Sequence, residues 1–113
     1  MEKVLVIKIN MVPSSKEGLE ERTRKSWKVS PKRLDDVKHI IVMHNQVVQE
    51  EYTIGDTLVY HLEGELKGRV ELQLKEYTEE KTLKGKKIKY LTSNPATIKS
   101  YKDLVNLIIE EDW

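Results

Sequence analysis

Short runs of β-branched and aliphatic residues, separated by turn-forming residues, constrain the fold of this chain most strongly. Residues 3–10 (KVLVIKIN) and 39–44 (HIIVMH) are apolar runs of strand length, and residues 46–54 read as a return strand after a turn at His44-Asn45. Gly55-Asp56 is expected to break that strand. Runs of this length are typical of strands in a small sheet.

The second half of the chain continues the pattern with weaker signals. Residues 57–63 and 68–77 predict a hairpin. Apolar and polar residues alternate in the second of these runs, which predicts a strand with one solvent-exposed face. Three further short strands are expected at residues 27–29, 88–91 and 96–98.

Three short helices are expected between and after these strands. Ser14 and Glu17 have capping-box spacing for a helix over residues 15–22, although Gly18 weakens it. Ser30-Pro31 is a favourable helix start for residues 31–37. Ser100 and Asp103 repeat the capping-box spacing, so a terminal helix follows, with Tyr101, Leu104, Val105 and Ile108 on its apolar face.

These elements predict an α+β fold. With 113 residues and 38% hydrophobic content, the chain has the size and core material of a single domain over residues 1–113. We expect a small curved antiparallel or mixed β-sheet, or an open pseudo-barrel, flanked by short helices and followed by a C-terminal helix.

Charge is sorted along the chain although its formal sum is only +1. Residues 22–33 hold six cations and no acid, and residues 81–102 hold seven cations and no acid. Separation of this kind creates a local positive field that favours an anionic partner, whereas the alternative is a solvated lysine-rich surface. Such a surface also favours a monomer.

Several classes of site lack the residues they need. The chain has no Cys, and no two of its three histidines have metal-binding helical spacing, so we expect no metal. Phosphate-loop and nucleophile-elbow motifs are absent, so we expect no cofactor and no catalytic residue. The apolar runs are too short to span a bilayer, which favours a cytoplasmic protein without a membrane partner.

Residues 22–33 (RTRKSWKVSPKR) are the strongest candidate for a binding segment. The indole of Trp27 offers a flat face on which a base can stack, and the surrounding cations can hold the accompanying phosphate. Equally, Trp27 can be a core residue of a short strand, since the chain has no Phe to fill that volume. The sequence leaves these two interpretations open.

The order of several short motifs resembles a small group within the PUA-like superfamily, related to its ASCH, EVE and YTH branches. The matching residues are Arg24, Ser26, Trp27, Val29, Ser30 and Arg33, then KHIIVMHNQVVQEEYTI, Gly68-Arg69-Val70, Leu83-Lys84-Gly85-Lys86 and Asn94-Pro95. This resemblance covers roughly residues 20–101. It implies a pseudo-barrel that binds nucleic acid or a nucleotide and takes one base, in some members a modified one, into an aromatic-walled pocket.

The resemblance assigns a role to each candidate ligand-binding residue. Trp27 would form a wall of the pocket, Arg24, Lys28 and Arg33 would contact phosphate, and Ser26, Asn45 or Asn94 would bind base edges. Extruding a base costs a few kcal/mol, which stacking and phosphate contacts must offset.

Two other functions remain open. One is an ASCH-like hydrolase of modified nucleosides, with Lys28, Thr23 and a strand glutamate as its functional groups. The other is a small factor of the phage or mobile-element type that binds a protein partner or sequesters a nucleotide. Product formation would identify the first, and a stoichiometric protein partner without nucleic acid would identify the second.

Overall fold

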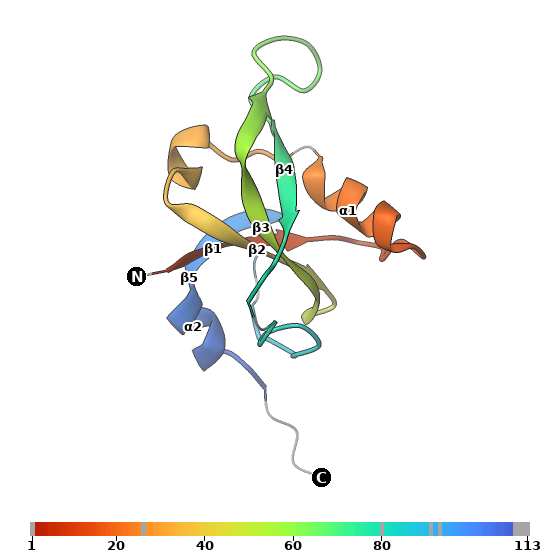
Figure 1. Ribbon diagram of the computed structural model, residues 1–113, viewed down its shortest axis with the longest axis vertical. Coiled ribbons are helices and arrows are strands. Elements are labelled where there is room, and N and C mark those ends of the chain that lie inside the picture. The colour runs from red at the N-terminus through yellow and green to blue at the C-terminus, as the bar shows by residue number, and fades with distance from the viewer. Residues whose placement is uncertain (1, 26, 80, 91, 93, 110–113) are drawn as a thin grey trace.

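A five-stranded mixed sheet is the framework of the protein (Figure 1). The computed structural model describes residues 2–25, 27–79, 81–90, 92 and 94–109. The strands are β1 (Lys3–Lys8), β2 (Val37–His44), β3 (Val47–Tyr60), β4 (Val70–Glu76) and β5 (Ala96–Ser100). The helices are α1 (Lys16–Arg24), the 3₁₀ turn η1 (Pro31–Leu34) and α2 (Tyr101–Asn106).

The sheet is open, with the strand order β4-β3-β2-β1-β5. β1 and β2 run parallel and are joined through α1 and η1, whereas every other neighbouring pair is antiparallel. β4 and β5 are the two edge strands. The expected α+β class, with a small mixed sheet and short flanking helices, is therefore confirmed.

Both faces of the sheet are covered by a hydrophobic core. On one face Leu5 and Ile7 of β1 pack in a cluster with Trp27, and Leu19 of α1 packs against it. On the other face Val4 and Val6 pack in a cluster with Leu104 of α2 and with Leu83 and Ile88. Burial on both faces explains why β1 and β2 are nearly continuous apolar runs.

The helix after β1 begins one residue later than the capping box predicts. Ser15, not Ser14, is the N-cap, and its hydroxyl accepts a hydrogen bond of 3.0 Å from the Gly18 amide. Gly18 does not end the helix. Its close approach to Pro13 and Ser15, where an added Cβ would lie 3.0 Å from each side chain, accounts for a glycine at this place.

Two sequence predictions need correction. The helix expected over residues 31–37 is only the 3₁₀ turn Pro31–Leu34, because β2 begins at Val37. Gly55-Asp56 does not break β3, which runs for 14 residues with a register irregularity between Ile54 and Leu58. The missing side chain at Gly55 makes room for Gln73 on β4, whose side chain would clash with an added Cβ.

The remaining short elements are smaller than expected. Trp27 forms a single antiparallel bridge with Val70, and Ile88 forms one with Ile108. Residues 96–98 are the start of β5, whereas residue 91 lies outside the described residues. In α2, Leu104 is buried as predicted, but Val105 is 40% exposed and does not belong to the core face.

None of the helices in the described ranges has the length and apolar character needed to cross a membrane.

Candidate anion-binding groove

A basic cavity is lined by residues that belong to or lie near both edge strands of the sheet, and we call it the seam groove. Its volume is about 440 Å³. It is lined by Lys28, Arg33, Arg69, Tyr90, Asn94, Pro95, Ala96, Thr97, Ile98 and Lys99. Arg69 adjoins the edge strand β4, while residues 95–99 belong to or adjoin the opposite edge strand β5. The sheet must therefore curve strongly for both edges to line one cavity.

A two-residue bridge places the first pair of cations. The Trp27 amide donates to the Val70 carbonyl at 2.9 Å, and the Val70 amide donates to the Trp27 carbonyl at 2.9 Å. In an antiparallel bridge the residue after one partner lies beside the residue before the other. Lys28 and Arg69 are thus neighbours in space.

The other two cations reach the groove from separate elements. Arg33 comes from η1, and Lys99 comes from β5, where it pairs with Val4 of β1. Among the described residues no carboxylate lines the groove. Four cations lining one cavity make the seam groove a site of positive potential.

The floor of the groove is part of the hydrophobic core. Ala96 and Ile98 pack against the same cluster that contains Trp27. Tyr90 is 9% exposed, and its hydroxyl donates to the Thr97 hydroxyl at 2.7 Å. These contacts pack β5 against the core and connect Thr97 of β5 to Tyr90.

Trp27 is a core residue and not a wall of an open pocket. It is only 3% exposed, and its indole N–H donates to the Thr23 carbonyl at 2.7 Å. The Arg22 guanidinium lies 4.8 Å from the ring centroid and occupies its face. Of the two interpretations left open by the sequence, burial of the indole favours a core residue, whereas a base-stacking role finds no exposed ring face at Trp27.

The other predicted site residues divide between the groove and other places. Lys28, Arg33 and Asn94 line the seam groove together. Arg24 ends α1 and does not line it. Asn45 is at the turn between β2 and β3, with φ of 50° and its amide 3.2 Å from His44 Nε2. Ser26 lies outside the described residues.

Sequence reasoning missed Arg69, Tyr90, Thr97 and Lys99 as members of the groove. Lys99 was visible as part of the second basic segment, but nothing in the sequence selects it from the other cations there. No sequence pattern marks Arg69 as a groove residue, because its position depends on the pairing of Trp27 with Val70.

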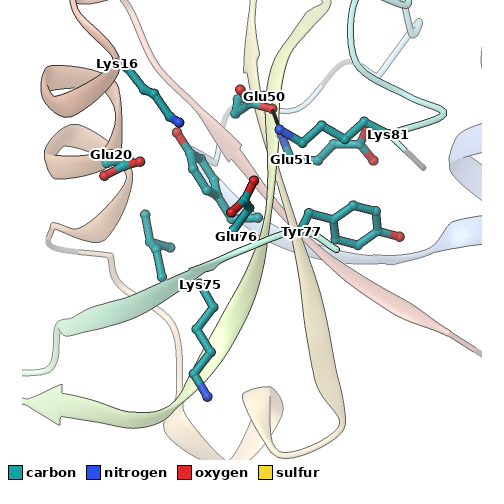
Figure 2. A pocket seen from close by; sticks show the side chains of 10 residues that line it. Lys16, Glu20, Glu50, Glu51, Lys75, Glu76, Tyr77 and Lys81 are labelled. Carbon is teal, nitrogen blue, oxygen red and sulfur yellow. Dashed lines mark hydrogen bonds and ion pairs between the residues drawn. The ribbon is translucent and has the colours of Figure 1, made fainter. Parts of the chain in front are cut away.

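A second polar cavity, of about 140 Å³, lies between α1, β3 and β4 (Figure 2). Glu50 faces it and accepts from Lys81 Nζ at 2.8 Å and from Lys84 Nζ at 2.9 Å. Burial tends to raise the pKa of Glu50, but the hydrogen bonds from Lys81, the Glu51 amide and Lys84 outweigh it and lower that pKa. Two cations of the second basic segment are thus paired with Glu50.

Glu51 is a structural carboxylate beside that cavity. It is 1% exposed. Its Oε1 lies 2.9 Å from His39 Nε2, and its Oε2 accepts from the amides of Leu83 at 3.2 Å and Lys84 at 2.9 Å. The role of Glu51 is to fasten the second basic segment to the sheet.

Two tyrosines at the same cavity stay protonated near neutral pH. Burial, with smaller contributions from Glu50 and Glu20, raises the pKa of the Tyr52 phenol well above its usual range. Burial and nearby carboxylates, of which Glu79 contributes most, raise the pKa of Tyr77 to about 12. Neither phenol is suited to act as a general base.

The groups of the hydrolase alternative do not converge. Thr23 is fully buried, and its hydroxyl donates to the Leu19 carbonyl at 2.7 Å, whereas Lys28 is exposed and lines the seam groove. Across the described ranges, no group of three or more His, Asp or Glu side chains is arranged to hold a metal ion.

The chain matches no protein-family model, no curated protein and no solved structure with which it was compared.

Proposed function

We propose that this protein is a non-catalytic binding module for a phosphate-bearing ligand, either nucleic acid or a nucleotide, held in the seam groove. One observation carries the proposal. Cations from four separate segments, at Lys28, Arg33, Arg69 and Lys99, line one cavity to which the described residues contribute no carboxylate. Guanidinium and ammonium groups in a concave site are the usual means of holding phosphate.

The polar neighbours of these cations support the same ligand class. Asn94 is exposed at the groove, and Thr97 contributes a hydroxyl beside Tyr90. Such groups commonly bind phosphate and sugar oxygens. A PUA-like fold remains part of the proposal, supported by the strongly curved open sheet and its flanking short helices, and so does a cytoplasmic, monomeric protein.

A salt titration of nucleic-acid binding tests the proposal. A fluorescent single strand of about eight nucleotides matches the site size of small binding modules. At about −0.7 in the log–log slope per phosphate contact, four contacts predict roughly a 50-fold loss of affinity between about 50 and 200 mM salt.

Arg33→Gln is the informative variant, with Lys32→Gln as its matched control. The two residues are adjacent, both are exposed, and both substitutions remove one positive charge, but only Arg33 lines the groove. We expect Arg33→Gln to weaken binding and reduce the slope by about 0.7, as expected for the loss of one phosphate contact. Equal effects of the two variants would instead mean diffuse attraction without a site.

A protein partner is the second candidate function, and one observation favours it. The β3–β4 hairpin projects from the body of the protein (Figure 1) and exposes Val59 (55%), Tyr60 (42%) and Leu62 (71%). Exposed apolar side chains gathered on one element are typical of contact surfaces. A stoichiometric protein partner that is lost in Leu62→Ser, together with indifference to oligonucleotides, would favour this alternative.

A further inference from the structure

A second cavity adjoins the seam groove. This cavity, of about 620 Å³, is lined by Lys89, Tyr90, Thr92, Lys99 and Leu107, and we call it the lateral cavity. Tyr90 and Lys99 line both cavities. The two therefore adjoin along the side of β5, and the lateral cavity leads toward the end of α2.

The cations are distributed along this double cavity. Arg33 and Lys28 line only the seam groove, Lys99 lines both cavities, and Lys89 lines only the lateral one. Within the described part of the chain, none of these four side chains takes part in an ion pair. With Arg69, five cations border the combined site, and in neither cavity is there a lining carboxylate among the described residues.

The double cavity offers cations, but the described residues give it no exposed aromatic face for a base. Trp27 is 3% exposed and covered by Arg22, and Tyr90 is 9% exposed with its hydroxyl bonded to Thr97. Stacking of bases on aromatic rings supplies much of the affinity in sites that recognise bases. The cations of the double cavity are complementary to the phosphates of a nucleotide and not to its base.

The shape of the site favours a flexible polymer. A single nucleotide would engage only the cations of one cavity. A duplex is stiff over about 50 nm and resists bending into a concave seam. A single strand can follow both cavities and place successive phosphates beside successive cations.

From these observations we infer that the ligand is an extended single strand of nucleic acid that runs through the seam groove and the lateral cavity, held by its phosphates without a base-specific pocket. This inference rests on the proposed function and adds to it the ligand's strandedness, its minimum extent and the absence of base selection.

The experiment measures the affinity of the purified protein for fluorescent oligonucleotides of increasing length. We expect affinity to rise with length until both cavities are filled, and homopolymers of different bases to bind within about threefold of one another. For a strand that fills both cavities, five contacts predict a log–log salt slope of about −3.5, compared with about −2.8 for a short strand in the seam groove alone.

Lys89→Gln and Lys86→Gln form the decisive pair. Both lysines are exposed residues of the same basic segment, but only Lys89 lines the lateral cavity. For the long strand, Lys89→Gln is expected to make the log–log salt slope less steep, from about −3.5 to about −2.8. Binding of the short strand is expected to stay unchanged. Lys86→Gln is expected to change neither.

The outcomes separate this inference from the proposed function. Equal affinity for a mononucleotide and a long strand, equal effects of Lys89→Gln and Lys86→Gln, a preference for duplex, or a strong preference for one base would each overturn the inference. In all four cases the seam groove would still be a phosphate site. No binding to any oligonucleotide or nucleotide would overturn the proposed function itself.

Discussion

Replacing Trp27 tests directly whether the indole supports the core or binds a ligand. Trp27 is 3% exposed, and full burial of a tryptophan removes roughly 150–250 Å² of surface from water. At about 25 cal/mol per Å² this area corresponds to roughly 4–6 kcal/mol. Measured substitutions of large buried aromatics by Ala cost about 3–5 kcal/mol, so we expect Trp27→Ala to lose about that much unfolding free energy.

Trp27→Phe separates packing from binding because it keeps a ring in the core. It removes the donor to the Thr23 carbonyl, so we expect it to lose about 1–3 kcal/mol from a buried acceptor left unpaired. Urea unfolding measures both variants. Salt-dependent oligonucleotide binding by folded Trp27→Phe should match that of the unaltered protein.

Two results would refute the assignment of Trp27 to the core. One is a Trp27→Ala protein as stable as the unaltered protein. The other is a folded Trp27→Phe protein that no longer binds oligonucleotides, since that would mean the indole itself meets the ligand. Arg22→Gln serves as a control, because losing the exposed cation over the ring should cost about 1 kcal/mol or less.

Two further predictions concern the carboxylates of β3. The lowered pKa of Glu50 gives stability at pH values above its ordinary pKa of 4.5, and this stability is lost as pH falls through the lowered value. Glu50→Gln should therefore cost about 1 kcal/mol at neutral pH and less than that at a pH well below 4.5, as measured by urea unfolding. Equal losses at both pH values would contradict this. Glu51→Ala should cost about 3–5 kcal/mol of unfolding free energy, because it leaves His39 and two backbone amides without their hydrogen-bond acceptor. Faster hydrogen exchange at Leu83 and Lys84 would confirm that Glu51 fastens this segment, and unchanged exchange would contradict it.

Much of the secondary structure could be predicted from local pattern. Residues 3–10 and 39–44 correspond to β1 and β2, because a continuous apolar run of strand length is stable only when buried on both faces. The turn at Asn45 was also predictable, since its φ of 50° suits Asn. Local signals of this kind act within a few residues and need no tertiary contact.

The prediction failed where a distant residue decided the local structure. Glycine at position 55 was expected to end a strand, but the Gln73 side chain on β4 occupies the space that any larger residue would need. The helix expected over residues 31–37 is cut short because Val37 pairs with Lys3 in the sheet. In both cases strand pairing outweighs a local preference.

The amino-acid sequence alone determined that the protein would contain strands joined by short helices, and that positive charge would be concentrated in two segments. It could not determine which cations meet. Lys81 and Lys84 neutralise Glu50, whereas Lys28, Arg33, Arg69 and Lys99 border one groove. Only the curvature of the sheet and the pairing of Trp27 with Val70 decide this, because they join segments far apart in the chain, and electrostatic attraction depends on distance in space and not on separation in sequence.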